Sequence, residues 1–473
     1  MPEKDKQTMK FNIILTLSIF IFYYSNLNAQ IIHYPPPPDS LSLGNNRYQI
    51  KVRELKPNPP KAWINLFEYK ASVRRDSICT TSFVQFDFKG KVELCILPQT
   101  ISIKDIKRID IRPLNNNIKY KIKNDGIYIV LNKPQNLSVE INKEKYSNLQ
   151  IFSSYPTSRK KRKHNNYIYF PKGVHTPSKD EYFIIPSNTT ICIAPGAILR
   201  GGILCKQVEN INIEGRGFII NSKQGIKIEH SHKIHIDGIT IINPIHYSIL
   251  GGESSEITIS NLRSFSSQIW SDGLDFMSCK DVTINNVFLR NSDDCLAFYN
   301  HRWNYYGNTQ NIKVTNSILW ADRAHPINIG THGNPQKAEY LENLIFENID
   351  ILEHREPYTN YQGCMAINVG DKNIARNITF KNIRIERITQ GTLFYLKVMF
   401  DKHWNKAPGG YISNIKFENI HSYITPQSKS FMHGYDSISN IQNIEFKNVY
   451  IQNKLIKDTD INKKGYVEKL TFY

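Results

Sequence analysis

An internal repeat constrains this sequence more than any other feature. Its unit reads Asn-Ile-x-Ile-x-Asn-Ile, with conservative replacements at the apolar positions. The clearest copies begin at Asn343, Asn377, Asn414 and Asn443, and weaker ones begin at Asn210, Lys233, Glu256, Asp281 and Asn311. The step grows from about 23 residues to more than 30 along the chain, which is the range of solenoid repeats.

The repeat predicts how each turn of the chain folds. Apolar and polar residues alternate, so each copy forms a strand that buries one face. The Asn between two such strands tolerates the left-handed backbone conformation that a sharp bend needs. One turn cannot bury its apolar face alone, so the turns must stack on one another. The Leu-rich spacing and helical segments of a leucine-rich repeat are missing. We therefore predict an all-β chain with a right-handed parallel β-helix over residues 165–473.

The region before the repeat has a different pattern. Residues 30–158 contain short alternating strands separated by Asn, Pro and Gly, which is typical of a β-sandwich domain. In residues 1–29, lysines precede an apolar run that is shorter than the roughly 20 residues of a membrane span. A small residue, Ala29, follows the run. This pattern predicts a signal peptide cleaved near Ala29, a secreted or periplasmic protein, and no membrane span in the mature chain. A membrane anchor is the alternative.

The composition of the chain indicates which kinds of partner it is expected to bind. The formal net charge is +18, with 60 Lys and Arg against 42 Asp and Glu. An exported chain with this charge is not expected to bind nucleic acid, and an acidic polysaccharide suits it better. The seven cysteines form no CxxC pair, so we expect mostly free, buried thiols and no zinc site. No other metal or cofactor is predicted.

Two neighbouring repeats carry an unusual group of acids. Asp272 lies in Trp-Ser-Asp-Gly-Leu-Asp, and Asp293 and Asp294 lie in Asn-Ser-Asp-Asp-Cys. Equivalent positions on successive turns lie about 4.8 Å apart, so these carboxylates should meet on one face. Carboxylates this close repel each other, and one should hold a proton. Acid-assisted glycoside cleavage needs one protonated acid for the leaving oxygen and a second acid that activates water. His325 falls one turn further on, whereas Asp275 is interpreted as a bend residue.

These motifs resemble those of glycoside hydrolase family 28, the polygalacturonases, which are related to the family 49 dextranases. The family pattern is Asn-Thr-Asp-Gly, then Asp-Asp, then Gly-His-Gly. Asp272 matches the first motif, Asp293 and Asp294 the second, and His325 the third. The resemblance covers residues 165 to 455 and implies a pectin-lyase-like solenoid. It also implies that Asp293 is the general acid and that Asp272 and Asp294 hold and activate water. The sandwich in front of the solenoid is more similar to the dextranase arrangement.

The substrate-binding residues depart from the family pattern. Where the family has Arg-Ile-Lys for a substrate carboxylate, this chain has Ala366-Ile367-Asn368, which puts galacturonate in doubt. In the loop after the acids, Arg302 can replace the lost charge and Trp303 can stack on sugar rings. A packed aromatic loop is the alternative. The predicted substrate-binding residues are Tyr299, His301, Arg302, Trp303, His332 and Asn368.

The predicted function is that of a secreted inverting glycoside hydrolase, polygalacturonase-like, acting on a pectin-type or related polysaccharide. A dextranase-like glucan hydrolase and a non-catalytic glycan-binding β-helix remain alternatives, and only turnover separates the last from an enzyme. A calcium-dependent lyase, which needs a calcium cage and an Arg or Lys as proton abstractor, is less favoured, because the acids come with His325 and with no Arg beside them in the sequence.

Overall fold

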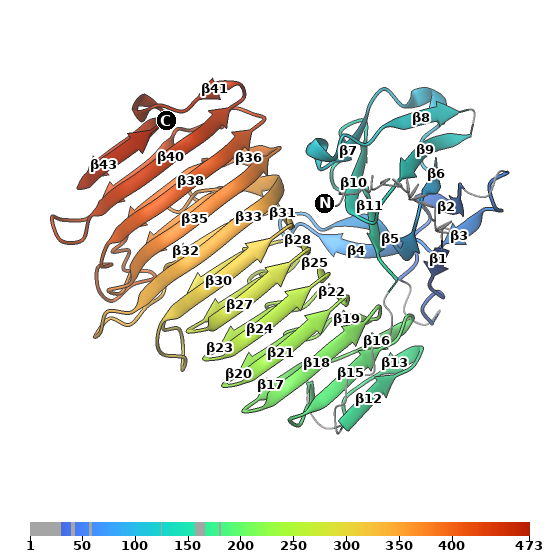
Figure 1. The fold of residues 1–473 in the computed structure, drawn as a ribbon, viewed down its shortest axis with the longest axis horizontal. Helices are drawn as coiled ribbons and strands as arrows, with labels where there is room; N and C mark the ends of the chain where they lie inside the picture. The colour runs from blue at the N-terminus through green and yellow to red at the C-terminus, as the bar shows by residue number, and fades with distance from the viewer. Residues whose placement is uncertain (1–29, 39–42, 56–58, 124, 157–165, 179–180) are drawn as a thin grey trace, which may run out of the picture.

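The computed structural model describes residues 30–38, 43–55, 59–123, 125–156, 166–178 and 181–473. The predicted signal peptide, residues 1–29, lies outside the described residues. Figure 1 shows two parts, a stack of parallel turns and a smaller β-structure beside it. The predicted fold class, a right-handed parallel β-helix preceded by a small β-sandwich, is confirmed. Among the described residues, none forms a helix long and apolar enough to span a bilayer.

The smaller part is a sandwich of two sheets that share one apolar core. Its pairings are antiparallel except that of β5 with β11. One sheet holds β1 (Gln30–His33), β4 (Tyr69–Val73), β5 (Cys79–Lys89), β7 (Ile109–Arg112), β10 (Asn136–Ile141) and β11 (Leu149–Ser154). The other holds β2 (Tyr48–Glu54), β3 (Ile64–Leu66), β6 (Val92–Pro98), β8 (Tyr120–Lys123) and β9 (Gly126–Leu131), and short 3₁₀ turns occupy Ile103–Asp105 and Leu114–Asn116.

The solenoid has three faces, and successive turns stack their strands in parallel register, whereas the short strand β41 pairs antiparallel with β40. The first face holds β12 (Asn166–Phe170), β15 (Thr189–Ile193), β18 (Glu209–Gly215), β21 (His232–Asp237), β24 (Ser255–Ser260), β27 (Lys280–Asn285), β30 (Thr309–Thr315), β33 (Tyr340–Arg355), β35 (Ile374–Ile385), β38 (Ile412–Ser422), β40 (Ile441–Ile451) and β43 (Val467–Phe472). From β33 onward these strands are long enough to continue onto the second face. The shorter strands there are β13 (Gly173–His175), β16 (Ala197–Leu199), β19 (Phe218–Ile220), β22 (Thr240–Ile242), β25 (Arg263–Phe265), β28 (Phe288–Asn291), β31 (Ile318–Ala321), β36 (Ile388–Gln390) and β41 (Lys454–Leu455).

The third face is a separate sheet, and it carries the acids. Its strands are β14 (Tyr182–Ile184), β17 (Gly202–Lys206), β20 (Ile226–Glu229), β23 (Ile249–Gly252), β26 (Leu274–Met277), β29 (Leu296–Tyr299), β32 (Ile327–Gly330), β34 (Met365–Val369), β37 (Phe394–Val398), β39 (Ser430–Gly434) and β42 (Ile461–Gly465). A 3₁₀ turn at Asp458–Asp460 precedes the last of them.

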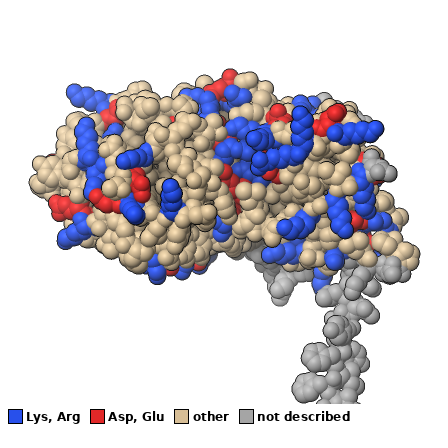
Figure 2. Space-filling model, turned by 90° about the horizontal axis from the view of Figure 1, so that it is seen from above, with Lys and Arg blue, Asp and Glu red and all other residues tan. Residues whose placement is uncertain are grey.

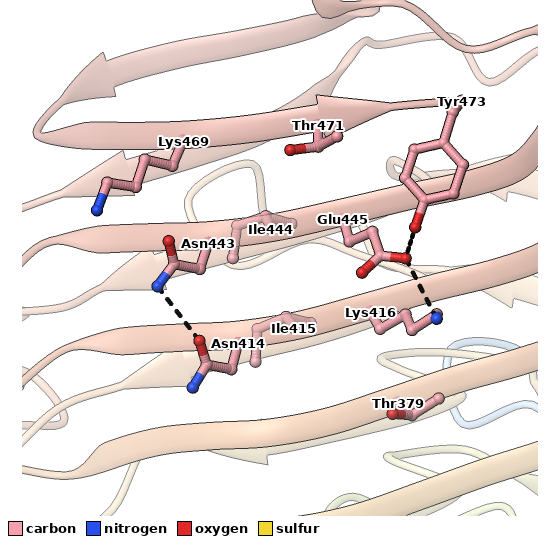
Figure 3. A pocket seen from close by; sticks show the side chains of 10 residues that line it. All are labelled: Thr379, Asn414, Ile415, Lys416, Asn443, Ile444, Glu445, Lys469, Thr471 and Tyr473. Atoms are coloured by element: carbon pink, nitrogen blue, oxygen red, sulfur yellow. Dashed lines mark hydrogen bonds and ion pairs between the residues drawn. The ribbon is translucent and has the colours of Figure 1, made fainter.

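The repeated asparagines form ladders at the bends. Asn377, Asn414 and Asn443 all have a φ of 56° or 57°, in the left-handed region that Asn tolerates. Each side-chain amide donates to the equivalent residue one turn earlier. Asn414 Nδ2 lies 3.2 Å from Asn377 Oδ1. Asn443 Nδ2 lies 3.3 Å from Asn414 Oδ1, and Figure 3 draws this second contact. The repeat thus supplies both the bend and a hydrogen bond between turns. The hollow in Figure 3 lies on the first face, away from the acids.

We expect Asn414→Ala to destabilise the fold by about 2–5 kcal/mol. It loses two ladder hydrogen bonds, each worth roughly 0.5–1.5 kcal/mol, and keeps a strained positive φ, at about 1–2 kcal/mol. Asn414→Gly loses the same hydrogen bonds without the backbone strain, so it should cost less. Denaturant unfolding of the two variants measures the difference. Equal losses in both would contradict the role assigned to the backbone conformation.

The solenoid core repeats with the turns. Phe346, Phe380, Phe417, Phe446 and Phe472 stack in one column, with ring centroids 4.9 to 5.2 Å apart and planes within 12° of parallel. The seven cysteines are free, and all but Cys79 are buried, as expected. The column continues because the apolar position of every copy falls at the same place on its turn.

The sandwich is docked on the second face through aromatic side chains. Phe83 of β5 stacks on Phe265 of β25, with centroids 5.3 Å apart, and Phe152 of β11 meets Phe288 of β28 at 5.0 Å. In Figure 1, β4 and β5 reach toward β25, β28 and β31. Buried polar contacts join the same surfaces: Gln85 donates to the Arg216 carbonyl, and Arg263 donates to Ser154. The two parts therefore share a core.

Candidate active site

Three of the predicted site residues occupy one row on the third face. Asp272, Asp294 and His325 each stand two residues before a strand, namely β26, β29 and β32. The strand residues Leu274, Leu296 and Ile327 that follow them are in register. Parallel register puts successive members of such a row about 4.8 Å apart. The row is therefore a direct product of the repeat.

Asp293 completes the group from the adjacent position. One carboxylate oxygen from each of Asp272, Asp293 and Asp294 can be chosen so that all three lie within 4.8 Å of one another. Among the described residues, this is the group that could hold a metal ion. Arg75 and His325 already pair with two of its three carboxylates, which offsets the negative charge that a cation would balance.

The three carboxyl groups differ in their affinity for a proton. Burial, followed by the charges of Asp275, Asp293 and Asp294, raises the pKa of Asp272 well above its usual range. Burial and the Asp294 charge also raise the pKa of Asp293. The pKa of Asp294 is lowered, because His325 and Asn328 outweigh the opposing effect of burial. Close titratable groups whose environments push their pKa values apart are suited to divide acid and base roles.

His325 carries both ring protons. Its Nδ1 lies 2.7 Å from Asp294 Oδ1, and its Nε2 lies 3.1 Å from the Tyr361 carbonyl oxygen. Both partners are acceptors, so both ring nitrogens must donate, and the ring is an imidazolium. Burial opposes this charge, but the Asp294 carboxylate raises the pKa of His325 above its usual value. The ion pair keeps Asp294 in its ionised form.

The lone pairs of Asp294 show where it can still react. Oδ1 accepts from the backbone N–H of His325 at 2.9 Å as well as from its ring. Oδ2 accepts from Asn328 Nδ2 at 2.8 Å. A carboxylate oxygen has two lone pairs, so Oδ2 keeps one free to take a proton from water.

An aromatic and basic group lies beside the acids. The Arg302 guanidinium lies 4.8 Å from the ring centroids of both Tyr299 and Trp303, and its Nη1 lies 4.0 Å from Asp275 Oδ2. Trp303 is 49 % exposed, so its indole is available to a ligand. The His332 ring makes a T-shaped contact with Tyr299, at 5.2 Å between ring centroids. The structure thus brings four of the predicted binding residues together.

The other two predicted binding residues have different surroundings. Nδ1 of His301 is hydrogen-bonded to the Tyr305 carbonyl at 2.9 Å, and the ring packs on Tyr306, so it is held within its own loop. Asn368 is fully buried, and its Nδ2 lies 3.5 Å from Asn328 Oδ1. Asn368 therefore meets Asn328, which in turn holds Asp294.

The interpretation of Asp275 as a bend residue is wrong. It lies inside β26, fully buried, and neither of its carboxylate oxygens has a hydrogen-bond partner among the described residues. Burial raises its pKa well above the usual range. The alternation of Leu274 and Phe276, which face the core, places Asp275 on the outer face beside Asp272. That alternation was a signal that sequence reasoning could have used.

Three further residues belong to the site without being among the predicted site residues. Asn328 lies one residue into β32, and Tyr361 places its hydroxyl 2.6 Å from Asn328 Nδ2. The third is Arg75, from the turn between β4 and β5 of the sandwich. Its Nη1 lies 2.5 Å from Asp293 Oδ2. No local sequence pattern connects a residue so far away along the chain with the acids.

Fold and site together define a pectin-lyase-like parallel β-helix with an acidic site on one face. Residues 202–466 match the family model described as Glycosyl hydrolases family 28, and the chain belongs to this family. The match includes Asp272, Asp293, Asp294 and His325, and it leaves out the sandwich.

Curated relatives are similar to part of the chain. A probable exopolygalacturonase B of Neosartorya fischeri is 26% identical over 200 residues, which are 41% of this chain and 41% of that protein. A probable endopolygalacturonase D of the same organism is 25% identical over 216 residues, covering 45% and 38%. The chain therefore spans about two fifths of the length of these relatives.

A solved structure is similar over nearly the whole chain. Dex49A from Penicillium minioluteum aligns with a TM-score of 0.59 and 14% identity, covering 92% of this chain and 96% of that one. At this identity the likeness concerns the fold, including a part that precedes the solenoid.

Proposed function

We propose that the protein hydrolyses glycosidic bonds of a polysaccharide, with Asp293 as general acid and Asp294 as the base that activates water. The observation that carries this proposal is the divergence of the acids: Asp293 has a raised pKa and Asp294, paired with His325, a lowered one. A protonated acid and an ionised base are the two roles that glycoside hydrolysis requires.

The reaction balances on these groups. Asp293 gives its proton to the glycosidic oxygen as the bond from that oxygen to the anomeric carbon breaks. Water, held between Asp272 and Asp294, forms the new bond to that carbon, and its proton passes to the free lone pair of Asp294 Oδ2. Attack on the face opposite the leaving group inverts the configuration.

The spacing of the carboxylates makes stereochemistry the informative measurement. Acid and base in inverting enzymes usually stand roughly 6.5–9.5 Å apart, on opposite sides of the sugar. Here one carboxylate oxygen of the proposed acid, Asp293, lies within 4.8 Å of one carboxylate oxygen of the proposed base, Asp294. A water at the side of the group, rather than between acid and base, reconciles this short distance with inversion. Asp294 is a poor nucleophile, since three donors already occupy its oxygens.

For the substrate we propose a pectin-type or related glycan that stacks on Trp303 and meets Arg302. The overall charge adds a general attraction to acidic polymers rather than a single docking point, since Figure 2 shows Lys and Arg spread over the visible face, with Asp and Glu among them. The amino-terminal pattern supports export to the periplasm or the medium.

Incubation with polygalacturonate, rhamnogalacturonan, dextran and pullulan tests the proposal. We expect new reducing ends from one polymer, and proton NMR of the first product should show the anomer opposite to that of the substrate linkage. Retention of configuration would overturn the assigned mechanism. Binding of one of these polymers without any cleavage would replace the hydrolase with a glycan-binding β-helix.

A further inference from the structure

The turn between β4 and β5 brings the sandwich to the acids. Besides the contact of its side chain with Asp293, Arg75 donates its backbone N–H to Ser292 Oγ at 3.1 Å. Arg75 and Asp293 side chains are each 18% exposed, so the pair is largely screened from solvent. A side chain from the smaller part of the protein thus contacts a carboxyl group of the candidate active site.

The next residue fixes this turn in place. Asp76 accepts hydrogen bonds from Arg323 Nη1 at 2.7 Å and from Arg355 Nη1 at 2.5 Å, and these arginines belong to two neighbouring turns of the solenoid. Although partial burial works against it, the two guanidinium groups hold the pKa of Asp76 below its usual value. Arg323 stands two residues before His325, so the turn is clamped beside the row of site residues.

Counting lone pairs shows what Arg75 does to Asp293. Oδ2 of Asp293 accepts from Arg75 Nη1 and from the backbone N–H of Trp270 at 3.2 Å, which occupies both of its lone pairs. Within the described part of the chain, Oδ1 accepts only from the backbone N–H of Asp294, at 3.1 Å. Oδ1 is therefore the oxygen that can carry a proton.

We propose that Arg75 is a positioning residue of the sandwich that directs the proton of Asp293 to Oδ1 and balances the charge left on Asp293 after it is transferred. This inference rests on the proposed function. Because Arg75 belongs to the sandwich, the inference makes the sandwich a part of the catalytic unit. The family match begins at residue 202 and does not include Arg75.

The pH profile of Arg75→Gln tests the role. Burial and Asp294 raise the pKa of Asp293, and Arg75 lowers it, so removing Arg75 should raise it further. An acid is active only while protonated, so activity is lost as pH rises through its pKa. The alkaline limb of kcat/KM should therefore move up by about one pH unit, within the range for loss of an adjacent opposite charge. The acid limb, set by Asp294, should stay in place, and kcat should fall about tenfold.

Matched variants separate positioning from a structural role. Arg75→Lys keeps the positive charge but not the planar donor group. It should therefore restore the position of the alkaline limb of kcat/KM more fully than it restores kcat. Arg108→Gln removes an exposed Arg–Asp pair of the same sandwich, and it should change neither the position of the alkaline limb nor kcat. An Arg75→Gln profile that is lower but unshifted would overturn the proposal and leave Arg75 only a role at the interface.

A second measurement is independent of turnover. Other charged groups near the pair include Asp272, Asp275, Asp294, His325, Glu356 and Arg302, and Asp76 with its partners Arg323 and Arg355. They are the same in wild type and variant, so the difference in Tm between the two proteins reports the Arg75–Asp293 pair. It should be larger at pH 8 than at pH 4, because a larger fraction of Asp293 is ionised at the higher pH. An equal difference in Tm at both pH values would contradict the Arg75–Asp293 pairing, whether or not wild type cleaves a polymer. Failure of wild type to cleave any polymer tested would count against the proposed function alone.

Discussion

Asp293→Asn is expected to lower kcat by about 10²–10⁴-fold, the usual contribution of a general acid. The amide keeps the size of the side chain and an oxygen for the donors Arg75 and Trp270. It cannot release a proton to the leaving oxygen, so the barrier to bond cleavage rises. Initial rates on the polymer identified for wild type, at saturating concentration, measure the loss.

Two controls protect this interpretation. Asp458→Asn changes an exposed carboxylate that pairs with Lys463 far from the acids, and it should leave kcat unchanged. The thermal transition of Asp293→Asn and its binding of oligosaccharide should remain near those of wild type. Turnover within a few-fold of wild type would remove Asp293 from the role of acid.

Arg112→Met is expected to have the largest effect on stability. Arg112 is 3% exposed, and it joins Glu140 of the sandwich, through Nη1 at 2.6 Å, to Glu386 of the solenoid, through Nε at 2.6 Å. It also donates to the Leu352 carbonyl. Removing one partner of a buried ion pair typically costs about 3–5 kcal/mol, because the other charge is left uncompensated. Denaturant unfolding at neutral pH measures the loss.

The pH dependence of this loss has a definite sign. Arg112 and Arg387 hold the pKa of Glu140 below its usual value despite burial, so their contribution is present above the unfolded pKa and is lost as pH falls. The deficit of Arg112→Met should therefore shrink toward acid pH, where both carboxyl groups become protonated. Arg108 is exposed, so the control variant Arg108→Met should show no comparable loss of stability. A deficit independent of pH would indicate lost packing rather than an unpaired charge.

The sequence predicted those parts of the site that repeat with the solenoid. Asp272, Asp294 and His325 hold equivalent positions on successive turns, so the period alone brings them together. The bends were predictable for the same reason, since Asn at each corner tolerates the left-handed conformation.

The parts that the sequence did not predict depend on contacts between distant segments. Arg75 reaches Asp293 only because the sandwich docks on β25 and β28, and no residue pattern encodes that docking. His301 lies beside Arg302 in sequence, yet the course of the loop turns its ring to Tyr305 and Tyr306. Loops of irregular length have no period from which side-chain directions follow.

The shared aromatic interface sets an order of events during biogenesis. The sandwich is complete at β11, but the partners of Phe83 and Phe152 are Phe265 and Phe288, which leave the ribosome more than a hundred residues later. Until those turns have been made, the sandwich exposes a face of large aromatic side chains, a surface that invites association with other unfinished chains. Protection of that face until the middle turns have folded is therefore a requirement on how the cell produces this protein.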